Sequence, residues 1–285
     1  MIFLTKLYRI LMTILSLSIL FFSDPSVASA DVLCKEGSPP EIKGEITKGD
    51  FLNLLKCLDS FAKKGRPQSE PTEDGKYNLK PIGWVYFDSE GGDVNEAIKI
   101  GRFLRESLSE VVVQDKCCSA CFMAIVGAVI VYAGEPFGEV GLHRIFYDKN
   151  ALGQTDMGEY EAFYNKLKKG AREYFYEMDV PTSIVEKVFS ISSSDIYFLK
   201  ESELKFLNSH PAYDEWIKAK CPNSLSKGEQ EDYSKYVSSG FRKGSFSDGY
   251  IEYLKRRNSD FELCVETVRW DQFKKTISKY FDKAN

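Results

Sequence analysis

Residues 84–147 read WVYFDSEGGDVNEAIKIGRFLRESLSEVVVQDKCCSACFMAIVGAVIVYAGEPFGEVGLHRIFY, and this stretch decides the fold. It begins with an apolar run that ends at Asp88 and turns through Gly91 and Gly92. Apolar residues then recur at helical spacing, as in a helix laid on a sheet. The expected elements are strands at 84–87, 111–113, 129–133 and 139–143, with helices at 94–104 and directly after the cysteine cluster. This alternation predicts an α/β fold.

The first thirty residues have the pattern of a secretory signal peptide. Lys6 and Arg9 precede an apolar run over 10–22, and Ala28 and Ala30 supply small residues before Asp31. We expect cleavage after Ala30 and a periplasmic or secreted protein. The alternative is an uncleaved anchor that holds the chain near the membrane.

Residues 31–285 divide into three predicted segments. An N-terminal helical segment spans 31–79, with an irregular start over 31–45 and an amphipathic helix over 51–61. The core spans 80–208, and a mostly helical extension spans 209–285. Further expected elements are a long helix over 157–178, a helix after Pro181, a strand over 196–199 and a last helix over 261–281.

Charge and composition exclude several classes of function. The 285 residues carry a formal net charge of -4, and no basic stripe marks a nucleic-acid surface. The chain has two histidines, and neither lies at zinc-finger spacing from a cysteine pair. We therefore predict no nucleic-acid partner, no metal and no cofactor.

Seven cysteines in an exported chain predict disulfides and leave at least one thiol over. Cys34 with Cys57 and Cys221 with Cys264 are the expected pairs, although spacing alone does not fix them. Cys118 and Cys121 form a C-x-x-C motif where a strand gives way to a helix. That setting lowers a thiol pKa in redox proteins, so a thiol-disulfide function is one alternative. A structural disulfide or two packed thiols is the other.

Three motifs in chain order point to nucleophilic catalysis. Ser119 stands at the predicted strand-to-helix junction, where helix N–H groups stabilise developing negative charge. His143, at the end of a later strand, would take its proton. Gly91 and Gly92 would bring backbone N–H groups to a carbonyl oxygen, together with the N–H of Ala120. Each motif also has a structural explanation of its own: Ser119 as a helix cap, Gly91 and Gly92 as a tight turn, and His143 as a solvated side chain. Their succession within one strand–helix unit favours a single site.

At these residues the chain resembles the Clp protease proteolytic subunits of the Clp/crotonase superfamily. The resemblance covers about residues 80–205 and is carried by FDSEGGDVNEAIKIGRFLR at 87–105, CCSACFMAIVGA at 117–128 and VGLHR at 140–144. It is closer still to exported bacterial members with a Cys-x-Ser-x-Cys-like nucleophile segment. It implies a spiral of β-β-α units, ring-like or stacked homo-oligomers and peptide or protein substrates.

The same resemblance implies a role for each motif residue. Ser119 would be the nucleophile and His143 the base, while Gly91, Gly92 and Ala120 would form the oxyanion hole. The third triad residue, an Asp in the family, falls in SISSSDIYFL at 190–199, where Asp195 is the nearest carboxylate and Ser192 occupies a neighbouring position. Alternatives are Asp179, a lysine such as Lys168 or Lys169, or no third residue. Residues 210–285 have no counterpart in the Clp subunit.

The sequence therefore predicts an exported Clp-like serine hydrolase, a peptidase with Ser119, His143 and Asp195 as its catalytic residues. The alternatives are a scaffold or binding protein of the same fold without turnover, and a redox protein that uses Cys118 and Cys121.

Overall fold

The computed structural model describes residues 31–36, 38–65, 70–71, 77–78, 83–145, 157–242 and 244–284. The predicted signal peptide and most of residues 66–80 lie outside these ranges.

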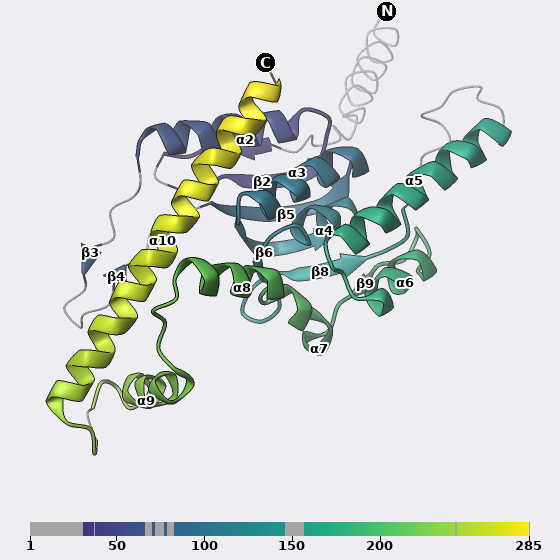
Figure 1. Cartoon of the computed structure of the whole chain (residues 1–285). Helices are drawn as coiled ribbons and strands as arrows, with labels where there is room; N and C mark the ends of the chain where they lie inside the picture. The colour runs from purple at the N-terminus through teal and green to yellow at the C-terminus, as the bar shows by residue number, and fades with distance from the viewer. Residues whose placement is uncertain are drawn as a thin grey trace, which may run out of the picture.

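Figure 1 shows a central sheet with helices packed beside it and one long C-terminal helix. The strands are β1 (Asp31–Leu33), β2 (Glu41–Ile46), β3 (Glu70–Pro71), β4 (Tyr77–Asn78), β5 (Trp84–Gly92), β6 (Glu110–Cys118), β7 (Ile130–Tyr132), β8 (Glu139–Leu142) and β9 (Tyr197–Phe198). The helices are α2 (Asp50–Lys63), α3 (Val94–Glu106), α4 (Ala120–Ile125), α5 (Met157–Glu177), α6 (Thr182–Ser190), α7 (Glu201–Leu204), the 3-10 helix η2 (Lys205–Leu207), α8 (Pro211–Lys220), α9 (Lys227–Ser238) and α10 (Asp248–Ala284).

The main sheet has a parallel centre with antiparallel edges. Its strand order is β1-β2-β5-β6-β8-β9, and β7 pairs with the other end of β6. Strands β2, β5, β6 and β8 are parallel to their neighbours in this series, whereas β1 and β9 run antiparallel. The chain is thus a mixed α/β fold. Because the centre is parallel, the carboxyl ends of β5, β6 and β8 meet at one edge of the sheet.

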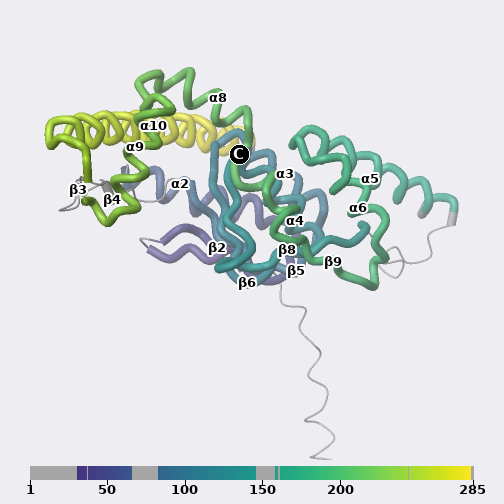
Figure 2. Tube along the Cα trace, turned by 90° about the horizontal axis from the view of Figure 1, so that it is seen from below, coloured from purple at the N-terminus to yellow at the C-terminus, as the bar shows by residue number. Residues whose placement is uncertain are grey.

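Helices cover one face of this sheet. In Figure 2 the helices α3, α4 and α5 lie above the strands β5, β6 and β8. Strand β5 alternates accordingly, because successive side chains of a strand point to opposite faces. Val85 and Phe87 are buried, whereas the next residue, Asp88, forms an ion pair with Lys43 at 3.0 Å. The other face of the sheet is therefore partly polar.

Helix α3 packs closely on α4 because glycines lie at the contact, Gly101 within α3 and Gly127 two residues after the end of α4. The Asp93 carboxylate caps α3 by accepting from the Glu96 N–H at 2.7 Å. A Cβ placed on Gly101 would stand 1.8 Å from the Tyr174 hydroxyl, and one on Gly127 would stand 2.0 Å from the Gly101 carbonyl oxygen. No larger side chain fits either position, so the second half of α4 and the turn after it are held close to α3.

The expectation of an irregular segment over 31–45 is wrong. Strands β1 and β2 occupy it, and β2 pairs in parallel with β5. Ile42 and Ile46 are buried on the helical side, while Lys43 and Glu45 between them face away. With only two apolar residues among six, the period-2 pattern was too sparse to recognise.

Residues from the C-terminal segment complete the main core. Trp270, Phe273 and Ile277 of α10 belong to the same hydrophobic cluster as the sheet and its helices. Nearer the end of α10, Tyr280 makes edge-to-face contacts with Phe51 and Phe103, with ring centroids 5.7 and 5.5 Å apart. None of the helices in the described ranges is long and apolar enough to cross a bilayer.

Candidate functional site

Ser119 has the backbone conformation of a strained junction residue. It links the end of β6 to the start of α4 with φ 55° and ψ -122°, a combination that residues with a Cβ rarely adopt. Such conformations cost of order 1–3 kcal/mol and persist only where the surroundings impose them. The Ser119 N–H donates to the Gly141 carbonyl oxygen of β8 at 3.1 Å. The half-buried side chain lies at the edge where β6 and β8 end.

His143 follows β8 directly and lines one small pocket together with Ser119. Only 9% of His143 is exposed. The pocket has a volume of about 10 Å³, room for roughly one water-sized group. Its other walls are apolar, namely Phe122, Met123, Leu142, Ile145, Phe175 and Val188. The two residues that the sequence pairs across 24 positions therefore share a pocket.

A backbone contact sets the tautomer of His143. Its Nδ1 lies 2.9 Å from the carbonyl oxygen of Arg144. A carbonyl oxygen only accepts, so Nδ1 must carry the hydrogen. In the neutral ring the lone pair is then on Nε2, the nitrogen that a general base facing Ser119 requires.

Gly91 and Gly92 are the last residues of β5, so the predicted turn after Asp88 is wrong. Gly92 has φ 130° and Gly91 has φ 114°, and both stay paired with β2. A Cβ on Gly91 would stand 2.6 Å from the Ser119 Cβ and 3.0 Å from the Ala120 nitrogen. A Cβ on Gly92 would stand 2.1 Å from the Ile46 carbonyl oxygen. The glycines thus let the β5 backbone touch both β2 and the Ser119 junction.

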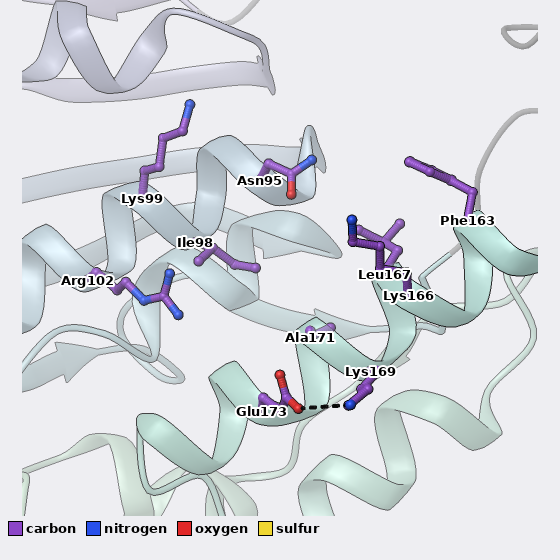
Figure 3. A pocket seen from close by; sticks show the side chains of 11 residues that line it. Asn95, Ile98, Lys99, Arg102, Phe163, Lys166, Leu167, Lys169, Ala171 and Glu173 are labelled. Carbon is purple, nitrogen blue, oxygen red and sulfur yellow. Dashed lines mark ion pairs between the residues drawn. The ribbon is translucent and has the colours of Figure 1, made fainter.

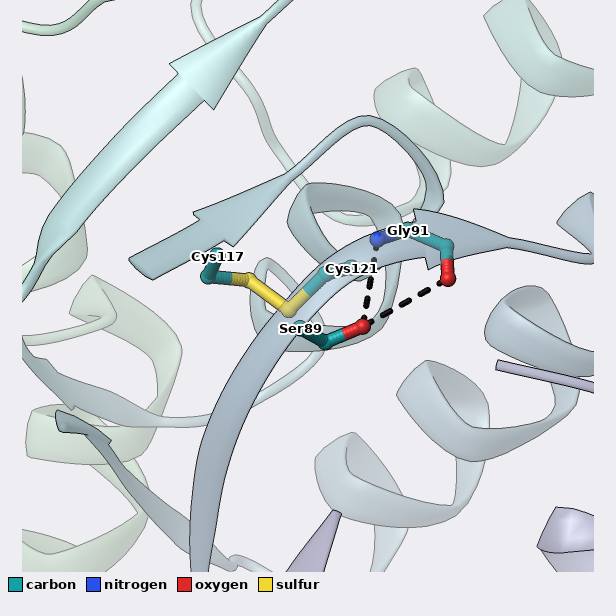
Figure 4. Close-up of a disulfide and its surroundings, with 4 residues drawn as sticks. All are labelled: Ser89, Gly91, Cys117 and Cys121. Carbon is teal, nitrogen blue, oxygen red and sulfur yellow. Dashed lines mark hydrogen bonds between the residues drawn. A yellow bond between two sulfur atoms is a disulfide. The ribbon is translucent and has the colours of Figure 1, made fainter. Parts of the chain in front are cut away.

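Ser89 supports this glycine pair, and the sequence reading missed it. The buried Ser89 hydroxyl accepts from the Gly91 N–H at 3.1 Å (Figure 4). Because the Gly91 N–H is used in this way, Gly92 and Ala120 are the better candidates for oxyanion donors. Ala120 is the first residue of α4, whose opening N–H groups have no partner within the helix. In the sequence, the signal for this role was the position of Ser89, whose hydroxyl lies two residues before the Gly-Gly pair.

Asp195 lies near the end of β8, but its side chain is exposed. The turn over 191–196 is tied to the site by the Arg144 N–H, which donates to the Ile191 carbonyl oxygen at 3.2 Å. Within the turn, the Asp195 N–H donates to the Ser192 carbonyl oxygen at 3.2 Å. These are backbone contacts, and neither of them joins the Asp195 carboxylate to His143.

The alternative third residues are engaged elsewhere. The Asp179 carboxylate lies 3.0 Å from Nε2 of His210, the second histidine of the chain. Lys169 pairs with Glu173 on the exposed side of α5 at 3.8 Å. Lys168 stands over the Phe189 ring, 5.8 Å from its centroid.

The disulfide in the cysteine cluster is not the Cys118–Cys121 pair of the C-x-x-C motif. Cys117 is bonded to Cys121, and Cys118 is a buried free thiol. Adjacent residues of β6 point to opposite faces, so Cys117 faces α4 while Cys118 lies against Gly141 of β8. Burial raises the Cys118 pKa to about 11. This arrangement contradicts a Cys118–Cys121 redox couple. The expected pairs Cys34–Cys57 and Cys221–Cys264 are both present.

A larger hollow of about 680 Å³ lies between α3 and α5, away from Ser119. Figure 3 shows Lys99 and Arg102 of α3 on one side and Lys166 and Lys169 of α5 on the other. Three of these cations have acidic neighbours, since Glu96, Glu177 and Glu173 pair with Lys99, Arg102 and Lys169. The described residues contain no group of three potential metal ligands.

No protein-family model matches the chain, and no curated protein matches it at a significant level. The resemblance to Clp proteolytic subunits therefore rests on the quoted motifs.

Proposed function

We propose that the chain is an exported serine hydrolase, a peptidase, with Ser119 as nucleophile and His143 as general base. One observation carries this proposal. Ser119 adopts a strained conformation at a strand-to-helix junction, directly against Gly91, and lines a small apolar pocket with His143. A serine that only capped α4 would accept a backbone hydrogen bond with its hydroxyl, and Ser119 makes no such cap.

The proposed reaction assigns a step to each of these residues. Ser119 Oγ attacks the carbonyl carbon of the scissile bond while His143 Nε2 accepts the hydroxyl proton. The N–H groups of Gly92 and Ala120 stabilise the oxyanion of the tetrahedral intermediate. His143 then gives the proton to the leaving group, and water hydrolyses the acyl-enzyme by the same steps. The Arg144 carbonyl keeps Nδ1 protonated throughout the cycle, so the exposed Asp195 is not required to orient the ring.

The proposal also includes a Clp/crotonase-like fold and a periplasmic or secreted location. The parallel centre of the sheet and the helices on one face are compatible with a Clp/crotonase-like spiral. Three disulfides are compatible with a periplasmic or secreted location. We further propose that the chain acts on peptides or proteins and assembles as a homo-oligomer.

A fluorophosphonate probe tests the proposal, because it labels a serine only when that serine is activated as a nucleophile. We expect the purified protein to be labelled, Ser119→Ala to abolish labelling and His143→Gln to slow it about a hundredfold or more. The matched controls are Ser194→Ala in the exposed 191–196 turn and His210→Gln, both of which should label at the wild-type rate. Equal labelling of wild type and Ser119→Ala would refute the proposal.

A scaffold of the same fold without turnover is the second candidate. The exposed side chain of Asp195 favours it, because a serine protease triad loses most of its activity without the third residue. A protein that resists the probe yet sediments as a defined oligomer would support the scaffold. Labelling confined to Ser119 would reject it.

A further inference from the structure

The conformation of Ser119 has to be imposed from outside the residue. Helix α4 has six residues, and the Ser119 side chain forms no cap hydrogen bond at its start. A left-handed φ at a non-glycine residue relaxes unless neighbouring groups hold it. Two backbone hydrogen bonds contribute, from the Ser119 N–H to Gly141 and from the Phe122 N–H to the Ser119 carbonyl oxygen, each 3.1 Å long.

A covalent bond spans the same residue. The Cys117–Cys121 disulfide joins the end of β6 to the first turn of α4, with Cα atoms 5.2 Å apart and Ser119 midway between the two cysteines. Both cysteines are fully buried. The disulfide therefore closes a short ring of chain whose central residue is the proposed nucleophile.

The disulfide also borders the residues that support the glycine pair. Cys117 is the register partner of Ser89 in the β5–β6 ladder. Figure 4 shows the disulfide beside Ser89, whose hydroxyl contacts Gly91. Gly91 in turn touches the Ser119 side chain. A change in the separation of β6 and α4 would thus move both Ser119 and the glycine pair.

The other two disulfides close much longer loops of chain than Cys117–Cys121 does. Cys221–Cys264 closes a separation of 43 residues and Cys34–Cys57 one of 23, against 4 for Cys117–Cys121. A crosslink stabilises a fold mainly by restricting the unfolded chain, and this effect grows with the length of the closed loop. The Cys117–Cys121 bond is thus the least suited of the three to stabilise the whole protein.

We propose that Cys117 and Cys121 are positioning residues for the proposed hydrolysis. Their disulfide holds Ser119 in its left-handed conformation, with the nucleophile kept at the pocket that it shares with His143. This inference rests on the proposed function for its catalytic part. Its structural part, that the disulfide imposes the Ser119 conformation, is independent of turnover.

The first test compares two disulfide-free variants. We expect C117A/C121A to lower the fluorophosphonate labelling rate and kcat about a hundredfold, as for a nucleophile misplaced by about 1 Å, with a small shift in Tm. The control C221A/C264A should lower Tm further and keep wild-type kcat. Wild-type labelling by C117A/C121A would overturn the proposal. So would failure of C117A/C121A to fold, because the disulfide would then stabilise the whole protein.

The second test needs no activity. Ser119→Gly relieves a left-handed φ, so it should raise Tm when the disulfide is present. In the C117A/C121A background we expect this gain to disappear, because Ser119 has already relaxed. An equal gain in both backgrounds would overturn the positioning role. If wild type is not labelled while the gain still depends on the disulfide, the proposed function fails and the structural inference stands.

Discussion

Gly91 touches Ser119 so closely that a single methyl group would not fit between them. A Cβ on Gly91 would stand 2.6 Å from the Ser119 Cβ, well inside van der Waals contact. The backbone of β5 and the proposed nucleophile are therefore in fixed relation. This contact makes Gly91 the most direct position at which to disturb the site without removing a reactive group.

We expect Gly91→Ala to lower kcat about a hundredfold, because the added methyl group displaces Ser119. The left-handed φ at residue 91 and the overpacking should together destabilise the protein by about 1–3 kcal/mol. The matched control is Gly170→Ala in α5, where a Cβ meets nothing within 4 Å. This control should stabilise the protein by about 0.5–1 kcal/mol at unchanged kcat. Denaturant unfolding and ester hydrolysis measure both effects.

The small pocket predicts a preference for short acyl groups. Met123 and Phe122 fill the space beside Ser119, so we expect the wild type to hydrolyse p-nitrophenyl acetate faster than the hexanoate ester. Met123→Ala should shift the ratio of kcat/KM toward hexanoate by about tenfold or more. Met178→Ala, also buried but outside the pocket, should lose comparable stability and keep the wild-type ratio. Equal ratios in all three proteins would contradict this assignment of the acyl pocket.

Asp195 gives a prediction about the triad. In serine proteases, loss of a working triad Asp lowers kcat about 10⁴-fold. Here the Arg144 carbonyl already fixes the His143 tautomer. We therefore expect the kcat of Asp195→Ala to stay within about threefold of the wild-type value, instead of falling about 10⁴-fold. Asp179→Ala, which removes the partner of His210, serves as the control for loss of an acidic side chain. A fall of several hundredfold in Asp195→Ala alone would show that this carboxylate orients His143.

Cys118 should be unreactive in the native protein. Alkylation requires the thiolate, and burial raises the Cys118 pKa from 9.0 to about 11. We expect one iodoacetamide-reactive thiol after unfolding and none in the native state at pH 8, by mass spectrometry.

The same shift predicts an alkaline effect on stability. A thiol whose pKa is higher in the folded state contributes stability below pH 9, and this contribution is lost as the pH rises to about 11. Cys118→Ala should therefore show a shallower fall in the free energy of unfolding between pH 9 and 11. A steeper fall in the variant would contradict the buried thiol.

Sequence periodicity was sufficient for the elements with full apolar faces. Helices α2 and α5 and strand β8 lie within a few residues of their expected bounds, because their apolar residues follow one clear period. Strand β2 was missed, since four of its six residues are polar or glycine. Strand β5 was cut short at Asp88, because a Gly-Gly pair normally marks a turn and here serves close packing against Ile46.

The site was predictable in part for similar reasons. The order of the motifs along the chain identified Ser119, His143 and Gly91 as candidates. They lie at one edge of the sheet because the strands that carry them are parallel. The cysteine pairing was misread because the motif was counted along the chain. Strand β6 continues through Cys118, so its neighbour Cys117 is the one that faces α4. The Arg144 carbonyl and Ser89 act through backbone geometry, for which residue type gives little signal.

The contact of Tyr280 with Phe51 and Phe103 has a consequence for how the chain matures. Helix α2, close to the start of the described chain, and α3 both pack against side chains near the far end of α10. A nascent chain that has not yet reached residue 280 lacks these partners and leaves part of its apolar interior uncovered. The core around α2 and α3 is therefore consolidated late, after the residues between 51 and 280 have been made.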